Sequence, residues 1–212
     1  MRQEYSIFIL SLQFLTRIPV RSGDHYTELR MAEIPRYFPL VGALIGTAGG
    51  AVFLVAHELL SLGSAVLVCV AATMALTGAF HEDGLADTFD GVGGGTSKSR
   101  ALEIMRDSRL GTYGTLAVVV ALLLKIAPLA ELPAHHIPIA LILGNTLSRL
   151  SSVLVLIQGR YVRDEGLGKP VAQGLSAKSA CVAVITAVAV TLLMWLFVGG
   201  VPVIVAIGAM LV

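Results

Sequence analysis

The sequence predicts an all-α protein, a polytopic helix bundle that crosses a membrane several times. Of its 212 residues, 56% are hydrophobic and only 14% are charged, whereas a soluble domain carries about a quarter charged residues. Apolar runs of about 20 residues recur along the chain, and each can cross a hydrocarbon core of about 30 Å. Because lipid offers no partner to unpaired backbone groups, these runs are expected to be helices. We expect residues 1–212 to form one integral membrane domain.

The expected elements follow the apolar runs in chain order. The first run, residues 5–20, is short, contains Gln13 and Arg17 and ends at Pro19. We expect it to lie at the interface or to enter the bilayer only partway. Full spans are expected at residues 38–60, 64–80, 112–131, 138–158 and 179–198. A last run, residues 201–212, is too short to cross, so we expect the natural protein to continue beyond it. The prediction is about six transmembrane helices and one short N-terminal helix.

Basic residues indicate how the chain is oriented. Lys and Arg number fifteen in all, and twelve of them fall in alternate connections, four in each. Those connections are the one before the first full span, residues 81–111 and residues 159–178. Cytoplasmic loops concentrate Lys and Arg, so all three are predicted to face the cytoplasm, with the protein in the cell membrane. A net charge of +1 without a basic arm gives no indication of nucleic-acid binding.

Residues 81–95, HEDGLADTFDGVGGG, concentrate four carboxylates between apolar runs. If this segment continues the 64–80 span as a helix, three of the aspartates stand at i, i+4 and i+7, within about 60° of one another. Three carboxylates this close repel one another unless a cation lies among them. Oxygen ligands favour Mg²⁺ or Mn²⁺, and Mg²⁺ usually completes its shell with water and substrate phosphate. The pattern predicts a metal site on Asp83, Asp87 and Asp90. The alternative is a solvated, acidic helix end.

Two neighbours of these aspartates are weaker candidates. Glu82 points away from the aspartate face on the same helix, so it is only a weak candidate ligand. His81 lies nearly opposite that face, and both interfacial packing and a supporting role stay open for it.

The residues after this motif suit a phosphate ligand. The glycines that follow Asp90 are expected to stop the helix and to leave backbone that a ligand can approach closely. Gly93 and Gly94 are therefore candidate substrate-binding residues. A short amphipathic segment then carries four cations, which could instead meet anionic lipid: Lys98, Arg100, Arg106 and Arg109.

Two more cations lie inside predicted spans. Arg149, with Asn145 and Ser148, is costly in lipid, so we expect it to face the bundle interior or a watery cleft and to bind substrate. Lys125 lies nearer the outer side and is expected to extend its amine toward the interface.

The pattern His-x-Asp-Gly-Leu-Ala-Asp-x-x-Asp-Gly at residues 81–91 resembles the signature of the cobalamin synthase, or adenosylcobinamide-GDP ribazoletransferase, family. Further motifs of that family follow its order: FLTRIPV at 14–20, FPLVGALIG at 38–46, EIMRDSRLGTYG at 103–114, SR at 148–149 and RYVRDEGLG at 160–168. Family members continue with a glycine-rich acidic segment of the Gly-Gly-x-Thr-Gly-Asp type. This sequence stops at Val212 without it, so we expect part of the site to lie on a segment beyond that residue.

The resemblance implies a phosphoryl-group transfer at the membrane. The family joins adenosylcobinamide-GDP to α-ribazole or its 5′-phosphate, releases GMP and uses Mg²⁺. Asp83 and Asp87 are expected to hold the metal, and Asp90 to complete its shell or to take the hydroxyl proton. Arg106 and Arg109 are expected to steady the diphosphate. The expected substrate-binding residues are Gly93, Gly94, Lys98, Arg100, Arg149 and Arg163.

Two other functions stay open at this point. One is a phosphatidyl-type alcohol phosphotransferase, whose signature has an Ala-Arg step and a wider aspartate spacing that this sequence lacks. The other is a divalent-cation transporter, which is expected to place its acids near the bilayer midplane within paired repeats. The oligomeric state and the number of metal ions also stay open.

Overall fold

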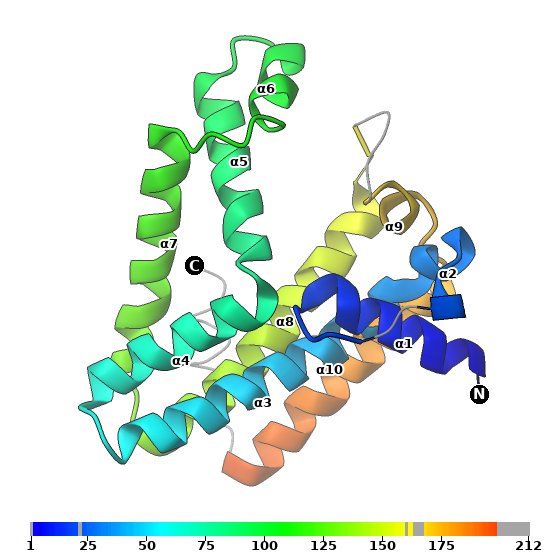
Figure 1. Ribbon diagram of the computed structural model, residues 1–212. Helices are drawn as coiled ribbons and strands as arrows, with labels where there is room; N and C mark the ends of the chain where they lie inside the picture. Colours follow the sequence, from blue (N-terminus) through cyan, green and yellow to red (C-terminus); the bar gives the residue numbers. More distant parts are fainter. Residues whose placement is uncertain (1, 21–22, 160, 163–167, 199–212) are drawn as a thin grey trace.

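The computed structural model describes residues 2–20, 23–159, 161–162 and 168–198. These residues are helical and contain no strand, which confirms the predicted fold class (Figure 1). The longer helices, in chain order, are α1 (Arg2–Leu15), α3 (Phe38–His57), α4 (Leu62–Thr77), α5 (Phe80–Gly94), α7 (Thr112–Glu131), α8 (Ile137–Gln158) and α10 (Ala177–Val198). Short helices join them: η1 (Gly23–His25), α2 (Glu28–Glu33), η2 (Ile34–Tyr37), α6 (Lys98–Ile104), η3 (Ala134–His136) and α9 (Lys169–Gln173).

Four helical stretches in the described part of the chain are long and apolar enough to cross a membrane. They are Glu28–His57, Thr112–Glu131, Ala134–Gln158 and Ala177–Phe197. A fifth span results if Leu62–Thr77 and Phe80–Gly94, which meet at an angle of 85°, are counted together as one broken span. The expectation of about six spans is therefore not confirmed as a number, and the apolar run 201–212 lies outside the described residues.

The centre of the bundle is the contact between α3 and α8. Gly42 and Gly46 lie against the backbone of α8, where a Cβ on either would overlap the carbonyl groups of Asn145 and Leu141. Small residues at such positions let two helix backbones approach closely in lipid. This packing holds α8 in place and with it the polar residues that α8 presents to the site.

A buried cation ties the N-terminal helix to the bundle. Arg36 of η2, which is only 6% exposed, pairs with Glu4 of α1 at 2.9 Å and with Glu33 of α2 at 2.6 Å. Its Nε–H also donates to the Ser179 hydroxyl of α10 at 2.8 Å. Since a buried guanidinium needs this set of partners, Arg36 orders α1, η2 and α10 relative to one another.

The chain breaks sharply between α4 and α5. Gly78 ends α4 in the left-handed conformation, at φ 66°. Ala79, also left-handed at φ 54°, donates its N–H to the Met74 carbonyl at 2.8 Å. The acidic motif therefore does not continue the preceding span, as the prediction of the aspartate face had supposed. The motif is helical, but α5 turns away from α4 and packs against α6 and α7 (Figure 1).

Candidate active site

Helix α5 divides its four carboxylates among different surroundings. Glu82 lines a large cavity between α4, α5, α7 and α8. Asp83 is exposed and lines a smaller pocket beside the end of α1. Asp87 is half-buried one turn later, and Asp90 is buried against the start of α7. The predicted aspartate face exists, with Asp83 at the smaller pocket and Asp90 at the start of α7.

Asp90 holds the N-terminus of α7. Its Oδ2 accepts the Gly111 N–H at 2.7 Å, and its Oδ1 accepts the Gly114 N–H at 2.8 Å. The first N–H groups of a helix have no partner within the helix, and a carboxylate there also favours the helix dipole. Gly111 and Gly114 lie so close that a Cβ on either would overlap this carboxylate. Both oxygens are thus engaged in holding α7, while the predicted roles of Asp90 as base or metal ligand stay predictions.

The donor set on α5 suits Mg²⁺ only with help from a substrate. Among the described residues, no three His, Cys, Asp or Glu side chains gather closely enough to hold a metal ion. Mg²⁺, however, is commonly bound through one or two carboxylates together with water and substrate phosphates. Asp83 and Asp87 stand one helical turn apart and offer oxygen ligands of this kind. The shared metal stays a prediction, with these two residues as its best-placed ligands.

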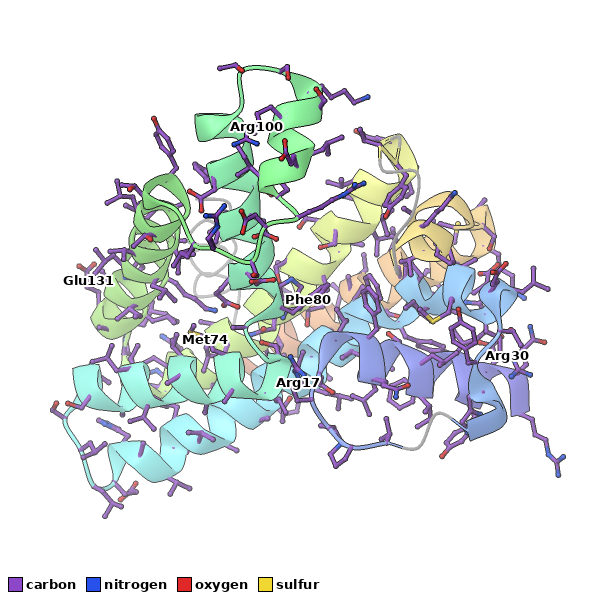
Figure 2. All side chains as sticks on the ribbon, turned by 45° about the horizontal axis from the view of Figure 1, so that its top comes forward. Arg17, Arg30, Met74, Phe80, Arg100 and Glu131 are labelled. Atoms are coloured by element: carbon purple, nitrogen blue, oxygen red, sulfur yellow. The ribbon has the colours of Figure 1, made fainter. Side chains whose placement is uncertain are left out.

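A polar pocket of about 410 Å³ lies where the chain breaks. Asp83 lines it together with Gln13 and Arg17. The Arg17 N–H donates to the Leu76 carbonyl at 2.7 Å, which fixes the chain after α1 against the end of α4. Figure 2 shows Arg17 beside this break, near Phe80 at the start of α5. Arg17 was not predicted as a site residue, because the sequence gives no sign that it lies near the acidic motif.

The large cavity has a volume of about 1070 Å³ and carries charges from three helices. Arg149 of α8 is 8% exposed, and its Nη1 donates to Asn145 Oδ1 at 2.9 Å and to Ser148 Oγ at 2.9 Å. The expectation that Arg149 faces the interior or a cleft is confirmed. Lys125 of α7 lines the same cavity, so the expectation that it extends toward the outer interface is wrong. Glu82, which points away from the aspartate face, provides a carboxylate in this cavity.

The glycine run after Asp90 has a packing role. Helix α5 ends at Gly94, within the glycine run, which confirms the expectation that these glycines stop the helix. A Cβ on Gly93 would overlap the Tyr113 ring, and one on Gly91 would overlap Met105. The missing side chains let the α6 segment and the start of α7 lie directly on α5. Substrate binding by Gly93 and Gly94 stays a prediction.

The predicted phosphate-binding cations lie on the exposed segment around α6. Lys98 and Arg106 are exposed, and Arg100 pairs with Glu103 at 2.8 Å. The Nε–H of Arg109 donates to Asp107 Oδ1 at 3.0 Å. Hydrogen bonds from the Arg109 side chain and backbone lower the pKa of Asp107 to about 2.

These contacts leave the cations within reach of a ligand but do not bring them together. Arg163 lies outside the described residues.

Comparison with known proteins identifies the family. The sequence model of the cobalamin-5-phosphate synthase family matches residues 7–212. This chain belongs to that family. No solved protein structure matches it.

Curated relatives bear the name adenosylcobinamide-GDP ribazoletransferase. One from Shewanella amazonensis is 41% identical over 198 residues, which cover 91% of this chain and 76% of the relative. One from Vibrio cholerae is 42% identical over 204 residues, covering 94% of this chain and 78% of the relative. One from Ralstonia pickettii is 43% identical over 176 residues, which cover 82% of this chain and 69% of the relative.

Membership of the cobalamin-5-phosphate synthase family confirms the resemblance drawn from the motifs and leaves the two other functions without support. The family match also includes segments that the structure brings to the site from far apart in the chain. Its range takes in the pocket residues Gln13 and Arg17, the acidic helix α5 and the cavity residues Lys125 and Arg149.

Proposed function

We propose that this chain transfers the cobinamide phosphate of adenosylcobinamide-GDP to α-ribazole or its 5′-phosphate and releases GMP. This completes the nucleotide loop of cobalamin. The observation that carries the proposal is the family match over residues 7–212, supported by relatives of about 40% identity that are named for this reaction.

The reaction is a displacement at phosphorus. A ribose hydroxyl of the acceptor attacks the phosphorus that bears the cobinamide side chain. The bond from that phosphorus to the bridging oxygen of the diphosphate breaks, GMP leaves with this oxygen, and the hydroxyl proton passes to a base. A bound Mg²⁺ would neutralise the phosphate oxygens and the charge that develops on the leaving group. Asp83 and Asp87 are the residues that would hold it.

Other residues of the site would bind and orient the donor. Arg106 and Arg109 are exposed and would contact the diphosphate from the segment between α6 and α7. The diphosphate would replace Asp107 as the partner of Arg109, since a phosphate accepts the same charge-assisted hydrogen bonds as a carboxylate. Asp90 would act chiefly by keeping Gly111 and the start of α7 against α5.

The proposed place of the reaction is the cytoplasmic side of the cell membrane. Only 6% of the most apolar stretch of α7 is buried inside the protein. Large apolar side chains that do not line the cavity, such as Val119 and Leu123, are therefore exposed along it. In water this would be an extended hydrophobic patch, so contact with lipid is the simpler interpretation. The cytoplasmic orientation of the acidic helix is supported by the three basic connections.

Two experiments test the proposal. Protein reconstituted in lipid with Mg²⁺ and adenosylcobinamide-GDP should release GMP only after α-ribazole or its 5′-phosphate is added. Movement of Mg²⁺ across the bilayer without GMP release would instead favour the transporter. For orientation, single cysteines are placed at Ser99 and Ala134 in a background without Cys69 and Cys181. A membrane-impermeant reagent added to intact cells should label the cysteine at 134 and leave the one at 99 unlabelled. Labelling of Ser99 from outside would contradict the cytoplasmic placement.

A further inference from the structure

The large cavity concentrates charge at one end. Glu82 of α5, Lys125 of α7 and Arg149 of α8 all line it, and they come from three different helices. Glu131 also lines it, but it stands six residues beyond Lys125, about 9 Å further along α7. The end near Arg149 therefore has two cations and one carboxylate. An excess of positive charge inside a mostly apolar cavity favours an anionic ligand.

Three buried polar atoms around this end have no hydrogen-bond partner among the described residues. They are Arg149 Nε, Glu82 Oε2 and His81 Nε2. Arg149 is more than nine-tenths buried, and its Nη1 has partners in the cavity wall, whereas its Nε has none in the described part of the chain. Buried polar groups are nearly always satisfied, so groups left over beside a cavity call for a partner that the protein does not supply, such as water, an ion or a ligand. The ligand should thus bring acceptor oxygens for Arg149 and a hydroxyl donor for Glu82.

Much of the remaining wall of the cavity is apolar, and part of it is aromatic. Leu85 and Phe89 of α5 face Leu116 and Val120 of α7 across it, and Tyr113 stands further along at the start of α7. The volume of about 1070 Å³ is close to the range of about 300–1,000 Å³ for pockets that take drug-sized ligands. A bicyclic base joined to one ribose belongs to that size class, whereas a corrinoid carrying guanosine diphosphate does not.

We infer that this cavity binds the acceptor nucleotide, with its 5′-phosphate at Lys125 and Arg149 and its aromatic base beside Phe89. The inference rests on the proposed function and assigns one of its two substrates to a place in the fold. The ribose lies between these ends, where the Glu82 carboxylate accepts a hydrogen bond from a hydroxyl. Glu82 and Phe89 are seven residues apart, about 10 Å along α5, and share one face of the helix.

This placement brings the two substrates to neighbouring faces of a single helix. The metal-binding candidates Asp83 and Asp87 lie about 100–140° around α5 from Glu82. A donor phosphate held at those aspartates and a ribose held along the cavity face would both border α5 at the same level. The attacking hydroxyl would thereby be oriented without a contact between the acceptor base and the donor.

The test separates the two substrates kinetically. Reconstituted protein with Mg²⁺ is assayed for GMP release with α-ribazole, with α-ribazole 5′-phosphate and with varied donor, and binding of α-ribazole 5′-phosphate is measured without donor. Lys125→Met and Arg149→Met should raise the KM and Kd for the phosphorylated acceptor about 10- to 150-fold, the range for a lost charge-assisted hydrogen bond. The KM for unphosphorylated α-ribazole and for the donor should change less than about threefold.

Matched variants sharpen this result. Phe89→Ala should raise the KM for both acceptor forms, because it removes the base contact. Lys178→Met, which removes an exposed cation on α10 outside the cavity, should leave every constant unchanged. Arg149→Lys retains the charge and should recover part of the binding of the phosphorylated acceptor if Arg149→Met does not fold.

Several outcomes would overturn the inference. One is a raised donor KM with unchanged acceptor constants, which would place the donor in the cavity. Another is no change in any constant, which would leave the cavity to lipid or to packing. Failure of the proposed function looks different, because the wild-type protein would then release no GMP with either acceptor. Binding of α-ribazole 5′-phosphate that Lys125→Met abolishes would support the site even in that case.

Discussion

Replacement of Asp90 by asparagine tests whether the third aspartate of the motif is structural or catalytic. The Asp90→Asn side chain offers one carbonyl oxygen, so only one of the two N–H groups, of Gly111 or of Gly114, retains its acceptor. The other then faces an amide donor. Loss of a hydrogen bond to a charged group costs about 1.5–3 kcal/mol. Loss of the charge at the helix N-terminus costs about 0.3–2 kcal/mol more. We expect the free energy of unfolding to fall by about 2–5 kcal/mol.

Two measurements check this value. Titration with a denaturing detergent reports the stability of the variant, and amide hydrogen exchange reports local protection at residues 111–115. Both should fall together, because the same hydrogen bonds determine both. Glu103→Gln, an exposed carboxylate change on α6, is the control and should shift stability by less than about 0.5 kcal/mol. If Asp90→Asn kept full stability and protection but lost turnover, the structural role would be refuted and a direct catalytic role favoured.

Three further predictions follow from the same region. Asp83→Asn and Asp87→Asn should each raise the Mg²⁺ concentration for half-maximal turnover at least about tenfold. The reason is that even residues that only support a metal ligand change metal affinity or activity about 10–100-fold when they are replaced. Unchanged Mg²⁺ dependence in both variants would remove the proposed metal. The pKa of Asp107 is lowered from 3.8 to about 2. Its pairing with Arg109 therefore stabilises the folded protein above pH 3.8, the pKa of an unperturbed aspartate, and this stabilisation is lost as the pH falls through about 2. NMR titration of the Asp107 carboxyl should give this value, and a midpoint near 4 would show that the pairing is absent. Gly78→Ala should destabilise the protein by about 1–2 kcal/mol, because residue 78 has a left-handed backbone. Overlap of the new Cβ with the Arg17 side chain should add to this cost. If detergent titration found the variant as stable as the wild type, the sharp break at Gly78 would be contradicted.

The fold class could be predicted from the sequence because it depends on composition and run length alone. Apolar runs long enough to cross a bilayer can hardly be anything but helices in lipid. The aspartate spacing likewise predicted a helix over the acidic motif, and α5 contains it. The glycines after Asp90 were expected to end the helix, and α5 does end within that run, at Gly94. What a local pattern cannot reveal is that Gly93 and Gly91 pack against Tyr113 and Met105 from later in the chain.

The site residues that sequence reasoning missed depend on contacts between distant segments. Lys125 was assigned to the outer interface from its position in α7, yet α7 turns it toward the cavity that Glu82 and Arg149 also line. Arg17 gave no local sign of its place beside Asp83. Asp90 reaches amides 21 and 24 residues further along the chain. Helical periodicity describes which residues share a face, but not which helix that face will meet.

The break at Gly78 is the feature that gives the acidic motif its surroundings. A straight continuation of α4 would carry α5 onward along the axis of α4. The 85° turn instead carries α5 to α7, so that α4, α5, α7 and α8 enclose the cavity. It also brings Asp83 to the pocket that Arg17 lines, at the point where the chain after α1 bonds to the end of α4. The motif thus supplies the carboxylates, and the left-handed break at Gly78 and Ala79 directs them to these surroundings.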